Sequence, residues 1–173
     1  MPRNPRGLSV GVLVVGWAAA CGRDGGSARL WVSVAAPGRD TVRFTAAAIA
    51  RPCRDDGGGV VLEGLESGSG IMVWLRPLPG DPRLAGSFGF PMAGDTAPRR
   101  RASVGVRFMS GAAAYGVTLD SGLVTVREID HGLAVDVRGA GLQLPGATRA
   151  FVEAGFEGVR VGSDRVPCEP EGS

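Results

Sequence analysis

The pattern of apolar residues beyond residue 28 most strongly limits what this chain can fold into. Apolar residues come in short runs, several of which alternate with polar residues, and glycine or proline stands between most of the runs. The runs are Leu30–Val34, Val42–Ile49, Val60–Leu62, Ile71–Leu75, Ser103–Met109, Tyr115–Leu119, Leu123–Ile129, Leu133–Val137 and Phe151–Val161. A period of two is typical of strands with one buried face, and no stretch of about ten residues here shows a capped helical stripe. We therefore expect an all-β fold, a single antiparallel β-sandwich or a partly closed barrel of about 7–10 strands.

The length of the chain predicts one self-sufficient domain. A domain of about 150 residues buries roughly 68–70% of the surface that its unfolded chain exposes. We place this domain at residues 29–173, with no internal linker long enough to divide it. Trp31 and Trp74 lie within apolar strand patterns, so we expect both side chains in the core.

The N-terminus carries the pattern of an export signal. Arg3 and Arg6 precede the apolar run Leu8–Ala20, which ends in small residues just before Cys21. The run is shorter than the roughly 20 apolar residues that cross a bilayer, and it fits the roughly 7–15 residues of a signal peptide core. We expect residues 1–20 to be a signal peptide. The Gly-rich, polar residues 21–28 would then be a flexible tether.

The sequence Ala18-Ala19-Ala20-Cys21 resembles the lipobox of bacterial lipoproteins. This resemblance implies that Cys21 receives a diacylglyceryl group and becomes the new N-terminus, so that the lipid anchors the protein to a membrane of the bacterial cell envelope. Ala18 stands where that class usually has leucine, and the same residues also fit ordinary secretory cleavage after Ala20. A soluble secreted or periplasmic protein, or one that retains an N-terminal helix, is therefore the alternative.

The three cysteines fit this interpretation. If Cys21 carries lipid, Cys53 and Cys168 remain as one even pair, and export permits them to form a disulfide. In the chain-entropy model, closing a loop of that length contributes roughly 4–5 kcal/mol to stability. Two unrelated buried thiols are the alternative.

Charge argues against a nucleic-acid partner. Removing Arg3 and Arg6 from the 19 basic residues leaves 17, which equals the 17 acidic residues. The mature chain therefore has no net side-chain charge with which to bind a polyanion.

No sequence motif predicts catalysis, a cofactor or a metal site. His131 is the only histidine, and it lies between Asp130 and Gly132 in an expected hairpin turn, where solvent would surround it. No CxxC or G-x-S-x-G occurs. We therefore expect no enzyme. The alternative is an enzyme or a metal or ligand carrier whose site forms only in the fold, with His131 near Glu128 or Asp136.

The region of residues 42–161 resembles a family of uncharacterised β-sandwich lipoproteins of Gram-negative bacteria. The matching residues include Ser121-Gly122, Val124–Val126, Gly155-Phe156 and Gly158-Val159. The resemblance implies a β-sandwich fold and supplies no catalytic residues. Together with the N-terminus, it predicts an exported, membrane-anchored lipoprotein that acts as a non-catalytic binding or structural module. Its partner would be an envelope protein, a glycan or a lipid.

Overall fold

The computed structural model describes residues 28–54, 57–91 and 97–168. The predicted signal peptide, the lipidation site Cys21 and the tether up to residue 27 lie outside these residues. Within the described part of the chain, no helix has the length and apolar character that crossing a membrane requires.

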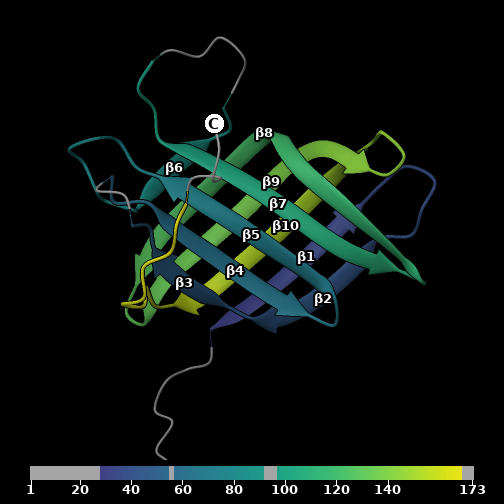
Figure 1. Ribbon diagram of the computed structural model, residues 1–173, viewed down its shortest axis with the longest axis horizontal. Helices are drawn as coiled ribbons and strands as arrows, with labels where there is room; N and C mark the ends of the chain where they lie inside the picture. Colours follow the sequence, from purple (N-terminus) through teal and green to yellow (C-terminus); the bar gives the residue numbers. More distant parts are fainter. Residues whose placement is uncertain (1–27, 55–56, 92–96, 169–173) are drawn as a thin grey trace, which may run out of the picture.

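Ten strands join into one open, curled sheet in the order β2-β1-β10-β9-β8-β6-β7-β5-β4-β3 (Figure 1). The strands are β1 Arg29–Ala35, β2 Val42–Ala47, β3 Ile49–Pro52, β4 Val60–Glu66, β5 Ser69–Arg76, β6 Gly86–Gly89, β7 Arg101–Ser110, β8 Ala113–Ile129, β9 Gly132–Leu144 and β10 Thr148–Val159. All neighbouring strands pair antiparallel except β6 and β7, which share one parallel pair. The prediction of an all-β fold is confirmed.

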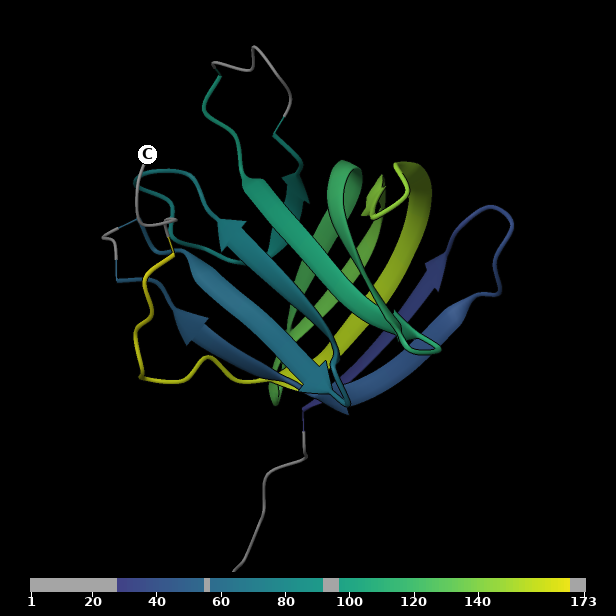
Figure 2. The ribbon, with the colours of Figure 1, turned by 45° about the vertical axis from the view of Figure 1, so that its right-hand side comes forward.

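The curl of the sheet results from a bend between β2 and β3, which are consecutive in sequence but lie at opposite ends of the strand order. The chain turns at Ala48, whose backbone N–H donates to the carbonyl of Ala28 at 3.2 Å. Beside this bend, β4 carries Gly64, where a Cβ atom would lie 2.4 Å from the Leu30 side chain and 2.9 Å from the Ala47 carbonyl. A glycine therefore lets β4 approach β1 and β2, and Figure 2 shows β2 and β4 converging at one end of the molecule.

Strand alternation places the core on the inner face of the sheet. In β8, Val124 and Val126 are fully buried, whereas Leu123 and Ile129 are exposed. Phe88 of β6 is fully buried as well. The principal core side chains are Leu30, Val32, Val34, Leu62, Val73, Leu75, Phe88, Val104, Phe108, Val124, Val126, Val135, Val137, Val152 and Phe156.

The expected core position of Trp31 is wrong, since 48% of this residue is exposed. Its neighbours Leu30 and Val32 take the inner positions of β1, so the period of two turns Trp31 outward. The indole instead lies against Gly155 of β10, where a Cβ atom would come within 2.3 Å of the ring nitrogen. Trp74 is half-buried.

Three elements differ from the expected strands. The run Val42–Ile49 is divided at Ala48, with Val42–Ala47 in β2 and Ile49 at the start of β3. The separate runs at Tyr115–Leu119 and Leu123–Ile129 belong to one strand, β8, because a register shift between Leu119 and Ser121 lets pairing with β9 continue. The short strand β6 was not expected. It has four residues, two of them glycine, and so carries no alternating pattern.

Substitution of Gly122 tests this arrangement. Gly122 has φ +123°, and a Cβ atom there would lie 2.1 Å from the carbonyl oxygen of Arg138. We expect Gly122→Ala to lower the free energy of unfolding by about 3 kcal/mol, because the residue must hold a positive φ and clash with backbone. Gly105→Ala is the matched control, since its Cβ would meet nothing within 4 Å; removing a strand glycine there should add about 0.5–1 kcal/mol. Urea unfolding of both variants measures the difference, and equal stabilities would contradict the β8–β9 register.

Candidate functional site

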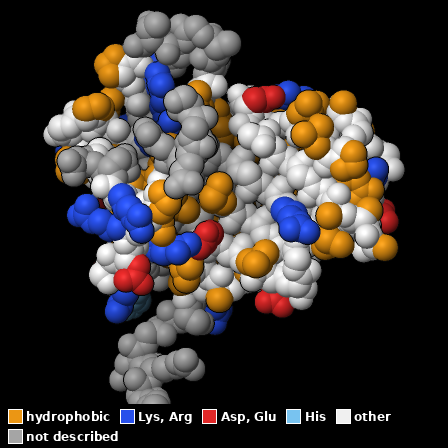
Figure 3. Space-filling model, viewed as in Figure 1, with side chains coloured by type: hydrophobic (Ala, Val, Ile, Leu, Met, Phe, Trp, Pro, Cys, Tyr) orange, Lys and Arg blue, Asp and Glu red, His pale blue; other side chains and the backbone are white. Residues whose placement is uncertain are grey.

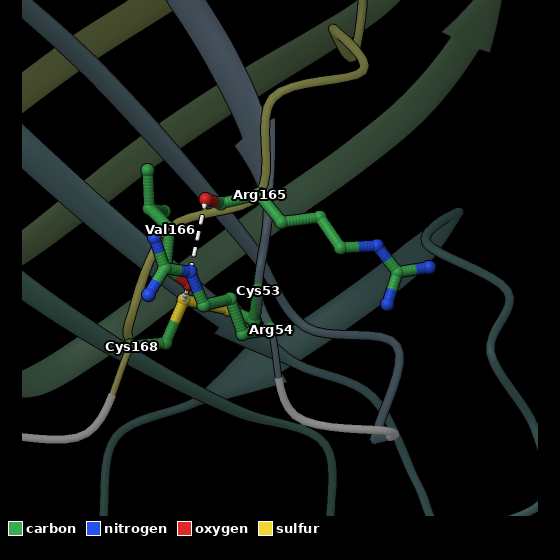
Figure 4. The surroundings of a disulfide bond; sticks show 5 residues. All are labelled: Cys53, Arg54, Arg165, Val166 and Cys168. Atoms are coloured by element: carbon green, nitrogen blue, oxygen red, sulfur yellow. Dashed lines mark hydrogen bonds between the residues drawn. A yellow bond between two sulfur atoms is a disulfide. The ribbon is translucent and has the colours of Figure 1, made fainter.

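Cys53 and Cys168 form a disulfide in the structure, with their Cα atoms 5.5 Å apart (Figure 4). Cys53 follows β3 directly and is only 3% exposed. Its backbone N–H donates to the carbonyl of Gly59 at 2.8 Å. Cys168 is half-buried. Because the Cys53 sulfur is enclosed by the protein, we interpret the disulfide as a structural crosslink rather than a reactive redox pair.

The disulfide fixes a C-terminal segment, residues 160–168, along the edge of β3. Parallel bridges join Ala50 to Val161 and Cys53 to Val166. The N–H of Val166 donates to the carbonyl of Pro52 at 3.0 Å, and Arg54 donates from its backbone to Val166 at 2.9 Å. The Arg54 side chain also reaches the carbonyl of Arg165 at 3.3 Å, which Figure 4 shows beside the sulfur atoms. An exposed strand edge invites pairing with other chains, so this segment protects the end of the sheet.

His131 lies exposed in the turn between β8 and β9, as the sequence predicts. The backbone carbonyl of His131 accepts a hydrogen bond from Arg160 Nε at 3.4 Å. Asp136 is one of the two carboxylates that the hypothesis of an enzyme or carrier site places near His131. It forms an ion pair with Arg127 instead, at 3.0 Å. Across residues 28–54, 57–91 and 97–168, no group of three or more His, Cys, Asp or Glu could hold a metal ion.

The carboxylates of Asp81, which is half-buried, and Asp120, which is exposed, have shifted pKa values, and both shifts come mainly from arginine partners. The Arg83 guanidinium, 2.7 Å from Asp81, holds the pKa of that carboxyl well below its usual range, and Arg100 adds to the effect at 3.3 Å. Arg149 lowers the pKa of Asp120 in the same way, at 2.5 Å. A general acid needs a pKa raised towards neutrality, so these pairs are surface ion pairs and do not resemble catalytic carboxylates.

A groove of about 910 Å³ lies on the outer face of the sheet. It crosses six strands in two rows of facing residues, which the strand registers define. The first row is Ile49, Glu63, Met72, Gly105, Thr118 and Leu142, and the second is Leu65, Gly70, Arg107, Gly116 and Leu144. Because these residues alternate with core residues, all of them belong to the solvent side of their strands.

Glycines form the floor of this groove. A Cβ atom at Gly105 would meet nothing within 4 Å, and one at Gly116 would meet only the Val106 carbonyl, at 4.0 Å. The backbone of β7 and β8 is therefore open between two apolar walls. The walls are Ile49, Leu65 and Met72 on one side and Leu142 and Leu144 on the other, each between 47% and 72% exposed. Figure 3 views the molecule from the side of β4, β5 and β7 and shows hydrophobic side chains around a region of backbone and small residues.

The groove has one unmatched charge among the described residues. The Glu63 carboxylate forms an ion pair with Arg51, so its charge is already neutralised. Arg107 rises from β7 between Gly70 and Gly116, its neighbours in the row. Within the described residues, Arg107 forms no ion pair or side-chain hydrogen bond. The groove is therefore apolar with a single available guanidinium.

Sequence reasoning missed this groove. One signal could have indicated it: the unbroken run Ile71–Leu75 places apolar residues on both faces of a strand, whereas a strand with a solvated outer face alternates. The groove itself depends on registers across strands that are distant in sequence, which no single run reveals.

Comparison with protein-family models, with curated proteins and with solved structures finds no match to this chain. Its function must therefore be inferred from its own residues.

Loss of the disulfide should destabilise the domain. We expect reduction, or the double substitution Cys53→Ala and Cys168→Ala, to lower the free energy of unfolding by roughly 4–5 kcal/mol, because the unfolded chain regains the entropy of a 115-residue loop. Urea unfolding with and without thiol measures the effect. Cys21→Ser is the matched control and should unfold with the thiol sensitivity of the parent chain. A parent chain that unfolds identically in both conditions would show that the crosslink adds no stability.

Proposed function

We propose that this chain is an exported lipoprotein, anchored through lipid on Cys21, whose β-domain is a non-catalytic binding module of the bacterial cell envelope. The pattern of residues 1–21 supports export and lipidation. The Cys53–Cys168 disulfide agrees with this, because such bonds persist in oxidising compartments and are rare in the cytosol.

The apolar groove carries the proposal of a binding role. A soluble protein rarely exposes a contiguous apolar surface of this kind unless it binds something there. Concave, mostly apolar sites with a few convergent polar groups are also the usual form of ligand sites. Five exposed apolar side chains around a glycine floor, with Arg107 beside them, match that description.

The anchor would hold this domain close to the membrane. Ala28, the first described residue, is seven positions beyond Cys21. A fully extended chain covers at most about 3.6 Å per residue, so Ala28 would stay within about 25 Å of the lipidated cysteine.

Membrane fractionation tests the anchor. In the native host we expect the protein in the membrane fraction, with an intact mass that corresponds to a diacylglyceryl group on a chain beginning at Cys21. Cys21→Ser should move the protein to the soluble fraction, because the lipid supplies its membrane affinity. The oxidised Cys53–Cys168 pair of that variant is the control for an unchanged fold. An unlipidated mass with release into the medium would instead support ordinary secretion after Ala20.

A further inference from the structure

We infer that the groove binds a long-chain fatty acid, with the hydrocarbon chain between the apolar walls and the carboxylate on Arg107. This inference rests on the proposed binding function and names its ligand class. Three observations carry it: the dimensions of the groove, its charge and its position relative to the tether.

The dimensions suit one flexible chain. Five strands, from β4 with Leu65 to β9 with Leu144, contribute to the second row. Neighbouring strands lie about 4.8 Å apart, so the row spans about 19 Å. The volume of about 910 Å³ falls within the range of small-molecule sites, roughly 300–1,000 Å³. Arg107 is the middle residue of this row, about 10 Å from either end, so the hydrocarbon chain bends along the two rows of the groove.

The charge selects an anionic headgroup. Arg51 already neutralises Glu63, whereas no described residue neutralises Arg107. A guanidinium binds a carboxylate through two parallel N–H donors, and one arginine balances one negative charge. A fatty acid therefore matches the groove better than an uncharged lipid or a headgroup with several charges.

The position of the groove places it near the source of such a ligand. A second hollow, of about 370 Å³, shares Ile49 with the groove and also includes Ala28, where the tether enters the domain. On a protein anchored at Cys21, Ala28 would lie within about 25 Å of the lipidated cysteine, and the groove begins at Ile49, in the hollow that contains Ala28. A fatty acid that leaves the membrane would meet this end first.

The binding experiment uses the full-length chain with Cys21→Ser, recovered oxidised from the soluble fraction, so that no attached lipid competes. Displacement of the fluorescent fatty acid cis-parinaric acid by palmitate measures affinity. We expect saturable binding of one molecule per chain. Gly105→Leu should weaken it about tenfold or more, because the new side chain fills the groove from an open position. Gly89→Leu is the matched control, since its Cβ also meets nothing within 4 Å but lies on β6, away from the groove.

The headgroup is tested separately. Arg107→Gln should weaken palmitate binding about tenfold, because a charge-assisted hydrogen bond is lost. The same variant should bind palmityl alcohol as the parent does, which a merely structural role of Arg107 would not predict. Arg43→Gln, an exposed arginine on β2 outside the groove, should leave both affinities unchanged.

Several results would overturn the inference. Absence of saturable palmitate binding would do so, and so would binding of lysophosphatidylglycerol without binding of palmitate. Dimerisation of the parent chain that Gly105→Leu abolishes would also do so, because a second copy of the chain would then occupy the groove. If Gly105→Leu fails to fold, the variants Leu142→Glu and Met72→Glu are used in its place, because each introduces a charge at a half-exposed position of a groove wall. Unchanged palmitate affinity in both variants would also refute the site. The protein used for this measurement carries no lipid, so a finding that Cys21 is not lipidated would leave the measurement unaffected. The proposals of a lipid anchor and of a fatty-acid site can therefore be refuted independently.

Discussion

The bend at Ala48 is the constraint on which the rest of the structure depends. A single stretch of chain passes there from one end of the strand order to the other, so the sheet curls and encloses its own core. Close approach at the bend needs Gly64, because any Cβ would collide with Leu30. The curl leaves β3 as an edge, and the C-terminal segment pairs with that edge under the Cys53–Cys168 crosslink. The long loop that this disulfide closes therefore connects the last residues of the domain to the strand that needs cover.

The curl also determines what lies outside. Gly70, Gly105 and Gly116 come from three neighbouring strands and occupy adjacent outward positions. Each glycine in a strand costs about 0.5–1 kcal/mol relative to alanine. At Gly105 and Gly116 the structure has room for a side chain, so packing does not explain the choice of glycine there. Several destabilising residues on one surface are typical of a functional site, where the shape of the surface is retained although it lowers the stability of the fold.

The sequence predicted the inner face of the sheet far better than the outer face. The run Leu123–Ile129 was recognised as a strand because burial imposes a period of two on each strand separately, and Val124 and Val126 are its buried residues. Trp31 was assigned wrongly because it lies within an apolar run, whereas the alternation of β1 turns it outward and the absence of a side chain at Gly155 leaves space for its indole there. The short strand β6 has too few residues for a pattern, although its Phe88 is fully buried. The groove arises from registers between six strands, and such information is absent from any local run.

The filled interior explains why a ligand site would lie on the outer face. Phe88, Phe108 and Phe156 project into the core, and each is at most 2% exposed. Large aromatic side chains at native packing density leave no room for a hydrocarbon chain among them. An outer groove also has a kinetic consequence, because a chain held against a sheet surface can leave without the strands separating. A domain tethered near a bilayer could then exchange an amphiphile with it while its disulfide-bonded core stays closed. A site inside the core would require local unfolding for each exchange, and the free energy of that opening would slow it.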